Sequence, residues 1–359
     1  KRMRQRRRDS AAEDHINSAA SGVPPVWGEY VAHSHTSRKN LINALICLCV
    51  LAPSIVATWA AYSRCSPDSH ATATLAEAAC SCAMGYPIAF ANLLFFLNVS
   101  LLFWLIGLAQ RSFWLIDPYW TLIPPLLGHL YQLHPNARFN EARSALALAL
   151  VWVWSLRLSH NYFRREDWKF GQREDWRYTK MAKDMPRSWP LVSFLAVGVA
   201  QQPMLVGLTL PAYAVHSDAA PLCWCDALAA IAAVAGLLLA WSADNELRRY
   251  MLANEELARE GKPRRQLLQS GLWRWSRHPN YFGEQIFWWS YAGLAVGIGS
   301  ASRREPTLLA VLTRMSRGAA ARSRRPLAAL HLGAPNGKAV VQPSKAEAKA
   351  EAAEVLATK

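Results

Sequence analysis

Residues 41–62 read LINALICLCVLAPSIVATWAAY, a run that contains no Asp, Glu, Lys or Arg. A helix of about 20 apolar residues is long enough to cross the hydrocarbon core of a bilayer. Comparable blocks follow along the chain, at residues 88–110, 142–160, 191–215, 222–243 and 281–299. A further block at residues 113–133 is weaker because Asp117 and three prolines interrupt it. We therefore predict an all-α polytopic membrane protein with about seven transmembrane helices.

The basic residues are concentrated in alternate loops. Residues 161–189 and 244–278 each contain eight Lys or Arg, whereas residues 63–87 contain one and residues 214–221 contain none. Loops rich in Lys and Arg stay on the cytoplasmic side of a membrane. With the basic N-terminus on that side, the alternation requires the weak block at residues 113–133 to span. Topology thus accounts for most of the net charge of +15, and we expect no nucleic-acid partner.

Composition divides the chain into three parts. Residues 1–40 are polar and basic, and we predict that they are disordered. Residues 41–299 form the transmembrane body. Residues 300–359 change to a basic sequence rich in Ala and Ser, which we also predict to be disordered and which is an atypical ending for such a body.

The seven cysteines do not have the spacing of a zinc site, so we predict no metal. Cys65, Cys80 and Cys82 fall in the loop predicted to be lumenal, where a disulfide is possible.

The sequence GLWRWSRHPNYFGE, which ends at Glu284, places many polar types at the mouth of an apolar segment. Arg277 and His278 can bind phosphates, Asn280 and Tyr281 can hydrogen-bond a ring or an amide, and Glu284 can carry a proton. Ionisable groups at a membrane segment usually face a cavity, a ligand or one another. The alternative interpretation is an interfacial anchor whose aromatic rings lie in the headgroup layer.

Two further polar clusters, at residues 157–178 and 244–249, are predicted to face the same compartment as this motif. Asp244 and Arg248 are four residues apart, so an ion pair along one helix face is the simplest expectation for them. Three clusters at one side of a Trp-rich bundle nevertheless favour a shared site for an anionic ligand.

The chain contains five short motifs in this order: Trp154-Ser-Leu-Arg157-Leu, Arg173-Glu-Asp-Trp-Arg177-Tyr178, Gln201-Gln202, Asp244 with Leu247, and Ser276-Arg-His-Pro-Asn-Tyr-Phe-Gly-Glu284. Together they resemble the steroid 5-alpha-reductase C-terminal-type family, and more closely its DUF1295 branch. The resemblance covers roughly residues 93–299.

This resemblance implies a multi-helix membrane bundle with a cytoplasmic-facing cofactor pocket. It also implies an enzyme that uses NADPH to reduce a carbon–carbon double bond of a lipid or steroid-like substrate, in the endoplasmic reticulum or another intracellular membrane. The residues expected to hold the dinucleotide are Asp244, Arg277, His278, Asn280 and Tyr281. Glu284 matches the family acid near the substrate carbonyl. A carboxyl group in a low-dielectric bundle can stay protonated and donate a hydrogen bond to an enone oxygen.

Two alternatives stay open. An isoprenylcysteine-type membrane methyltransferase also carries Arg-His-Pro near a Tyr and a Gly, although Asn280 and Glu284 favour the reductase. An inactive membrane scaffold is the other alternative, because the family usually continues with a further membrane segment that residues 300–359 do not resemble. NADPH binding, S-adenosylmethionine binding or neither would separate the three.

Overall fold

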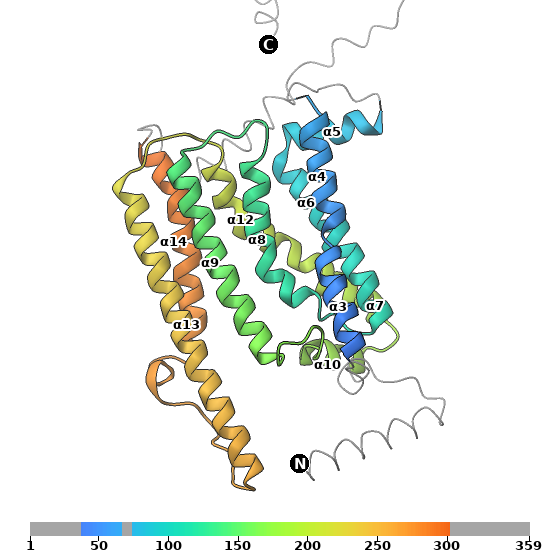
Figure 1. Ribbon diagram of the computed structural model, residues 1–359, viewed down its shortest axis with the longest axis vertical. Helices are drawn as coiled ribbons and strands as arrows, with labels where there is room; N and C mark the ends of the chain where they lie inside the picture. The colour runs from blue at the N-terminus through green and yellow to red at the C-terminus, as the bar shows by residue number, and fades with distance from the viewer. Residues whose placement is uncertain (1–36, 67–73, 302–359) are drawn as a thin grey trace, which may run out of the picture. The chain divides into compact units, whose positions relative to one another are not determined.

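The computed structural model of the protein describes residues 37–66 and 74–301, and every regular element in these two ranges is a helix (Figure 1). The helical fold class predicted from the sequence is therefore confirmed. Residues 37–40 and 300–301 belong to segments predicted to be disordered, but they are helical as parts of α3 (Ser37–Cys49) and α14 (Pro279–Ala301). The rest of those two segments lies outside the described residues.

The α-helices follow one another as α3 (Ser37–Cys49), α4 (Ala52–Arg64), α5 (Leu75–Gly85), α6 (Pro87–Phe95), α7 (Trp104–Gln110), α8 (Ile116–Gln132), α9 (Glu141–Arg165), α10 (Trp176–Asp184), α11 (Trp189–Ser193), α12 (Gln202–Val215), α13 (Trp224–Arg259) and α14 (Pro279–Ala301). Two π-helical segments, η1 (Phe96–Phe103) and η2 (Phe194–Gly198), and two 3₁₀ segments, η3 (Val199–Gln201) and η4 (Gly271–Arg274), lie between them.

Within the described residues, four helical stretches are long and apolar enough to cross a membrane: Ser37–Arg64, Pro87–Gln110, Trp189–Val215 and Trp224–Arg259. The other three predicted segments are also helical, as α8, α9 and α14. Pro124 and Pro125 lie inside α8 and do not interrupt it, contrary to the expectation from the sequence. Helices in apolar surroundings tolerate proline where neighbouring groups satisfy the freed backbone carbonyls.

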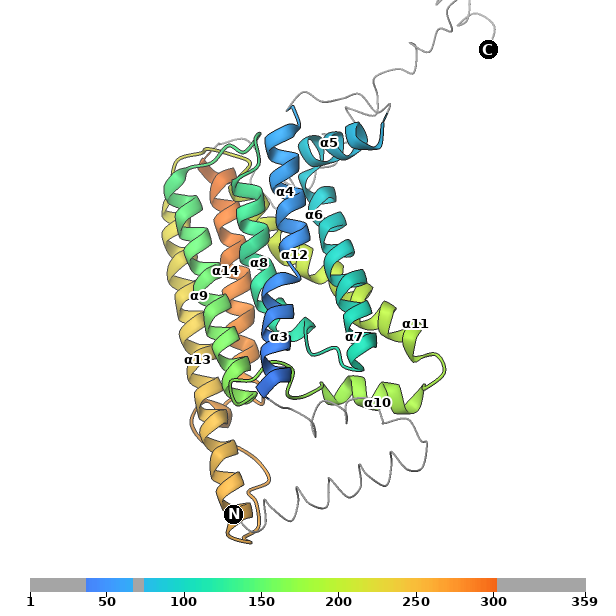
Figure 2. The same ribbon diagram turned by 45° about the vertical axis from the view of Figure 1, so that its right-hand side comes forward.

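The long helices run side by side, and the chain reverses direction between one and the next (Figures 1 and 2). At the end that carries α5, a disulfide joins Cys65 to Cys80, and the amide of Arg138 donates to His216 O at 3.0 Å. Neutral loops gather at this end, which we call the disulfide end.

The basic loops meet at the opposite end of the bundle, beside α10, which we call the basic end (Figure 2). There the loop before α10 contacts α3, because Asn43 Nδ2 donates to Phe170 O at 2.9 Å. Arg164 of α9 reaches Asn245 of α13 at the same end. The predicted grouping of basic loops at one end and neutral loops at the other is thus observed in the bundle.

Helices α13 and α14 pack closely because glycines face each other across their contact. A Cβ atom on Gly236 would lie 2.7 Å from Gly283 O, and one on Gly283 would lie 2.6 Å from the amide nitrogen of Ala240. Small residues at such positions let two membrane helices approach backbone to backbone. This contact determines how the first turns of α14 lie on α13.

Helix α13 is the longest element, with 36 residues. At 1.5 Å per residue its length is about 54 Å, well beyond the roughly 30 Å core of a bilayer. Its last turns project from the basic end (Figure 1). The chain then returns along the helix, because Asn254 exchanges two hydrogen bonds with the backbone of Arg265, at 2.9 and 3.1 Å.

A buried ion pair joins α9 to α13 at the disulfide end. Arg143 is 0% exposed and binds both oxygens of Asp226, at 2.8 and 2.9 Å. Its remaining donors bind the backbone oxygens of Ala220 and Pro221. Four of the five N–H donors of the guanidinium therefore hold the start of α13 and the loop before it.

We predict that Asp226→Asn lowers the free energy of unfolding by about 3 kcal/mol, because it leaves the Arg143 charge buried without a counter-ion. Thermal unfolding in detergent measures the change. Asp184→Asn is the matched control, since Asp184 pairs with Lys180 on the surface and its loss should cost less than about 0.5 kcal/mol. Equal effects of the two substitutions would contradict the structural role of the pair.

Candidate functional site

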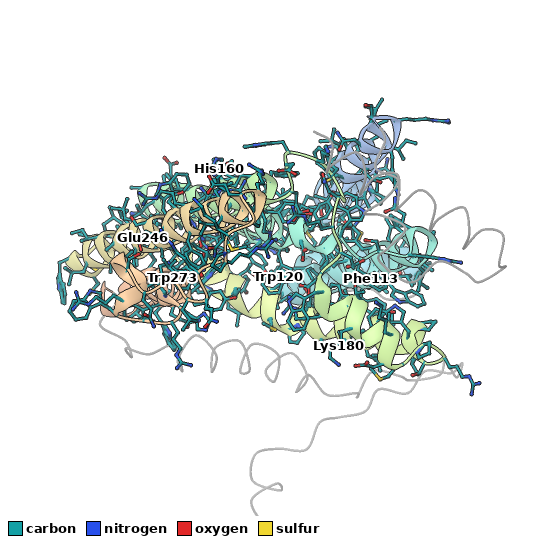
Figure 3. The ribbon with its side chains drawn as sticks, turned by 90° about the horizontal axis from the view of Figure 1, so that it is seen from below. Phe113, Trp120, His160, Lys180, Glu246 and Trp273 are labelled. Atoms are coloured by element: carbon teal, nitrogen blue, oxygen red, sulfur yellow. A yellow bond between two sulfur atoms is a disulfide. The ribbon has the colours of Figure 1, made fainter. Side chains whose placement is uncertain are left out.

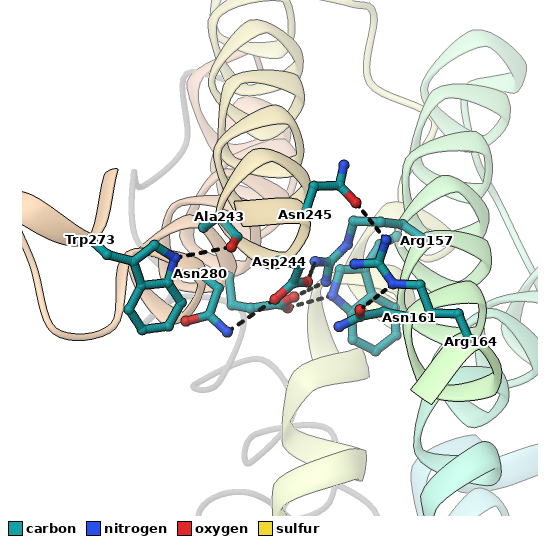
Figure 4. A network of polar contacts seen from close by, with 10 residues as sticks. Arg157, Asn161, Arg164, Ala243, Asp244, Asn245, Trp273 and Asn280 are labelled. Carbon is teal, nitrogen blue, oxygen red and sulfur yellow. Dashed lines mark hydrogen bonds and ion pairs between the residues drawn. The ribbon is translucent and has the colours of Figure 1, made fainter. Parts of the chain in front are cut away.

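Three helices bring one arginine and two carboxylates together near the basic end (Figure 4). Arg157 of α9 donates from Nη1 to Asp244 of α13 at 2.9 Å and from Nη2 to Glu284 of α14. The side chains of Arg157 and Asp244 are 5% and 7% exposed, and that of Glu284 is 20% exposed. We call these three residues the Arg157 cluster.

The cluster has one positive and two negative charges, so each carboxylate needs further donors. Trp154 Nε1 donates to Glu284 at 2.6 Å, and Asn280 Nδ2 donates to Asp244 at 3.1 Å. Taking an ion out of water costs several kcal/mol unless hydrogen bonds and a counter-ion replace the water. The four donors supply that replacement.

The spacing of these residues along α9 and α14 places their side chains on the same helix faces. Trp154 and Arg157 are three residues apart on α9, and Asn280 and Glu284 are four apart on α14, so each pair shares a helix face. Gly283 lies directly before Glu284 and permits the close contact with α13. The position of the carboxylate therefore depends on the absence of a side chain at the neighbouring residue.

The turn of α13 that carries Asp244 binds α9 through Asn245 and the segment η4 through Ala243 and Glu246. The backbone oxygen of Ala243 accepts from Trp273 Nε1 at 3.0 Å, and Asn245 accepts from Arg164. Glu246 accepts from the amide of Leu272 at 2.9 Å. Figure 3 shows Glu246 and Trp273 near each other at one side of the basic end, whereas Phe113 and Lys180 lie at the other.

The structure brings together three of the six predicted site residues, namely Asp244, Asn280 and Glu284. The other three, Arg277, His278 and Tyr281, are exposed just beyond the cluster. The rings of His278 and Tyr281 stack with their centroids 5.3 Å apart. The expected pairing of Asp244 with Arg248 is wrong, because the Asp244 carboxylate points to α9 and α14 instead.

Arg157 and Trp154 were missing from the predicted site residues. Both lie in a motif that the sequence analysis singled out, and Arg157 is a charged residue inside an otherwise apolar block. A charge at such a position has to find a partner within the bundle. That rule could have identified Arg157 as a site residue, although it could not have named the partner.

Three polar atoms around the cluster have no hydrogen-bond partner in the described part of the chain: Arg157 Nε, His160 Nδ1 and Asn280 Oδ1. An unsatisfied buried polar group costs about 1–3 kcal/mol. Such atoms suit a ligand with polar groups of its own, such as the carboxamide of a nicotinamide. The exposed Arg277 and His278 suit its phosphates, as does the N-terminus of α14, which begins at Pro279.

No group of three or more His, Cys, Asp or Glu within residues 37–66 and 74–301 could hold a metal ion.

Comparison with known proteins gives one family and one relative. Residues 103–315 match the family described as "Protein of unknown function (DUF1295)". An uncharacterised protein of Schizosaccharomyces pombe is 27% identical over 193 residues, which are 49% of this chain and 55% of the yeast protein. The chain thus spans about half the length of that relative. No solved structure matches the chain.

The motif at residues 173–178 has a structural role in the described residues. Asp175 caps α10 by accepting from the amide of Arg177 at 2.8 Å. Glu174 accepts from the amide of Phe113 at 2.6 Å and so joins the loop before α10 to the loop before α8. Burial raises the pKa of Glu174 to about 7, although the hydrogen bond from the Phe113 amide opposes the rise.

We predict that the protein loses stability as the pH rises through the window from about 4.5 to about 7. In that window Glu174 is ionised in the unfolded chain but protonated in the folded one, so the folded state binds more protons. The free energy of unfolding should fall by up to about 3 kcal/mol. Unfolding curves at about pH 5 and pH 8 measure the effect, and Glu174→Gln should reduce it. An unchanged pH dependence in that variant would show that other groups cause it.

Proposed function

The chain belongs to the DUF1295 family of membrane proteins, and on this premise we propose that it is a membrane-bound NADPH-dependent reductase. Its reaction would be the reduction of a carbon–carbon double bond in a lipid or steroid-like substrate. The observation that carries the proposal is the Arg157 cluster, a buried charged group surrounded by polar atoms without partners.

The chain's residues divide into two roles in this proposal. Arg277 and His278 bind the phosphates from the exposed side, and Asn280 offers its free oxygen to the nicotinamide carboxamide while its nitrogen holds Asp244. Tyr281 stacks on His278 and completes the exposed part of the site. NADPH supplies the hydride when it is bound.

Glu284 would act on the substrate carbonyl. In the arrangement described it accepts from Arg157 and Trp154, whereas polarising a carbonyl oxygen requires a donor. Arg157 can hold Asp244 alone through Nη1. We propose that substrate binding releases Glu284 from Arg157, so that the carboxylate takes up a proton from solvent and, as a carboxylic acid, donates a hydrogen bond to the developing enolate oxygen.

One observation favours a second candidate. Both oxygens of Glu284 already have partners, which is also what a purely structural ion cluster requires. An inactive membrane scaffold would use the Arg157 cluster only to hold α9, α13 and α14 together. An isoprenylcysteine-type methyltransferase remains the alternative enzyme class, and S-adenosylmethionine binding would identify it.

We further propose seven transmembrane helices, with the basic end in the cytoplasm and the disulfide end in the lumen of the endoplasmic reticulum. Two observations support this orientation. The basic loops share one end, as the positive-inside rule requires, and Cys65–Cys80 lies at the other, where an oxidising compartment would maintain it. The nicotinamide site would then open to the cytoplasm.

Cysteine labelling in sealed vesicles tests the orientation. Ser188 and Ser217 are exposed and belong to the basic and disulfide ends. In a background whose free cysteines are replaced by serine, an impermeant reagent outside microsomes should label Ser188→Cys and not Ser217→Cys. Labelling of both from the same side would contradict the seven-helix count.

Substitutions at Glu284 and Asn280 test the reductase. Glu284→Gln should lower turnover by about two orders of magnitude, the typical effect of losing one transition-state donor, with little change in NADPH affinity. Asn280→Ala should first weaken NADPH binding, because its hydrogen bonds are lost. Steady-state kinetics with an enone lipid and NADPH titration of the purified chain measure the two effects.

Glu256→Gln is the control, because Glu256 pairs with Arg259 on the projecting part of α13. A structural cluster predicts a different pattern, in which both substitutions lower the melting temperature and leave activity per folded molecule unchanged. That pattern, or failure of the folded wild-type chain to bind NADPH, would overturn the reductase proposal.

A further inference from the structure

Glu246 connects the buried cluster to the exposed stretch that carries Arg277 and His278. It lies on α13 two residues after Asp244 and is half-buried. Its Oε2 accepts the amide hydrogen of Leu272 at 2.9 Å. A hydrogen bond to a charged acceptor is stronger than one between neutral groups, so Glu246 is well suited to hold a loop in place.

Gly271 shows how closely the loop is pressed against this carboxylate. Its φ is +57°, in the left-handed region that glycine adopts without strain. A Cβ atom at Gly271 would lie 2.5 Å from both oxygens of Glu246. A side chain at residue 271 would therefore displace the Glu246 carboxylate and would also be strained by the positive φ.

A second contact fixes the same segment. Trp273 Nε1 donates to the backbone oxygen of Ala243, one residue before Asp244. The turn of α13 from residue 243 to residue 246 thus holds the loop on one side and, through Asp244, both Arg157 and Asn280 on the other. One turn of α13 therefore contacts both the segment that leads to Arg277 and His278 and the buried Arg157 cluster.

We propose that Glu246 is a positioning residue for the dinucleotide. By holding Leu272 it orients the stretch from residue 271 to residue 281, so that Arg277 and His278 face the phosphates while Asn280 faces the nicotinamide. This inference rests on the proposed reductase function and adds a residue that touches neither cofactor nor substrate.

Charge alone predicts the opposite effect, which makes the inference testable. A carboxylate near a phosphate site repels the negatively charged ligand. If Glu246 acted only through its negative charge, removing the carboxylate would therefore tighten NADPH binding. A positioning role predicts weaker binding after Glu246→Ala. Glu246→Gln distinguishes the two further, since its amide oxygen can still accept from Leu272 although the charge is lost.

The experiment measures NADPH affinity, kcat and hydrogen exchange in the full-length protein in detergent. Glu246→Ala should weaken NADPH binding about tenfold, the scale of one charge-assisted hydrogen bond, with kcat at saturating NADPH changed less than about threefold. Glu246→Gln should restore most of the affinity. Gly271→Ala should weaken binding in the same direction, which keeps the test valid if Glu246→Ala does not fold.

Hydrogen exchange provides the readout that does not depend on the cofactor. Amide exchange in residues 271–278 should rise in Glu246→Ala and stay unchanged in the control Glu256→Ala, whose partner is Arg259. Unchanged exchange and unchanged NADPH affinity would overturn the positioning role while leaving the reductase proposal intact. Tighter NADPH binding in both Glu246 variants would overturn it in favour of simple repulsion. A wild-type chain that binds no NADPH would overturn the proposed function itself, and the inference with it.

Discussion

Arg157 places a positive charge between two carboxylates inside the helix bundle, and the arrangement of α9, α13 and α14 follows from that charge. Without it, Asp244 and Glu284 would repel each other in surroundings that screen charge poorly. With Arg157 present, α9 contributes the arginine and α13 and α14 contribute one carboxylate each. The network therefore needs all three helices. The guanidinium therefore determines both where the helices meet and what kind of chemistry their meeting point can support.

Packing and charge act on the same few residues. The glycine contact between α13 and α14 brings the backbones close enough for Asn280 to reach Asp244. Glu284, which follows Gly283 on α14, then accepts a hydrogen bond from Arg157 of α9. The opposite end of the bundle uses the same principle in Arg143 and Asp226, where the guanidinium is 0% exposed and makes four hydrogen bonds. Around the Arg157 cluster, Arg157 Nε, His160 Nδ1 and Asn280 Oδ1 have no hydrogen-bond partner within the described residues.

Much of this arrangement could be predicted from the sequence. Apolar blocks of bilayer length indicated the helices, and alternating loop charge indicated which loops share an end. The convergence of Asp244, Asn280 and Glu284 followed from motifs that had to face one compartment. Spacing along a helix shows which side chains share a face, but it does not show which other helix they meet. For that reason Asp244 was expected to pair with Arg248, and α8 was predicted as the weakest of the seven segments because of prolines that the folded helix contains.

The length of α13 has a mechanical consequence. One close contact of this helix with α14 is at Gly236, about 12 Å along the axis from Asp244 and about 35 Å from Arg259 at the projecting end. A straight helix that tilts about that contact behaves as a lever with unequal arms. A sideways movement of about 3 Å at the tip becomes about 1 Å at Asp244, more than the range of about 0.5 Å over which a hydrogen bond keeps its strength. A molecule that binds the last turns of α13 would thus displace Asp244 within the Arg157 cluster without contacting the cluster itself.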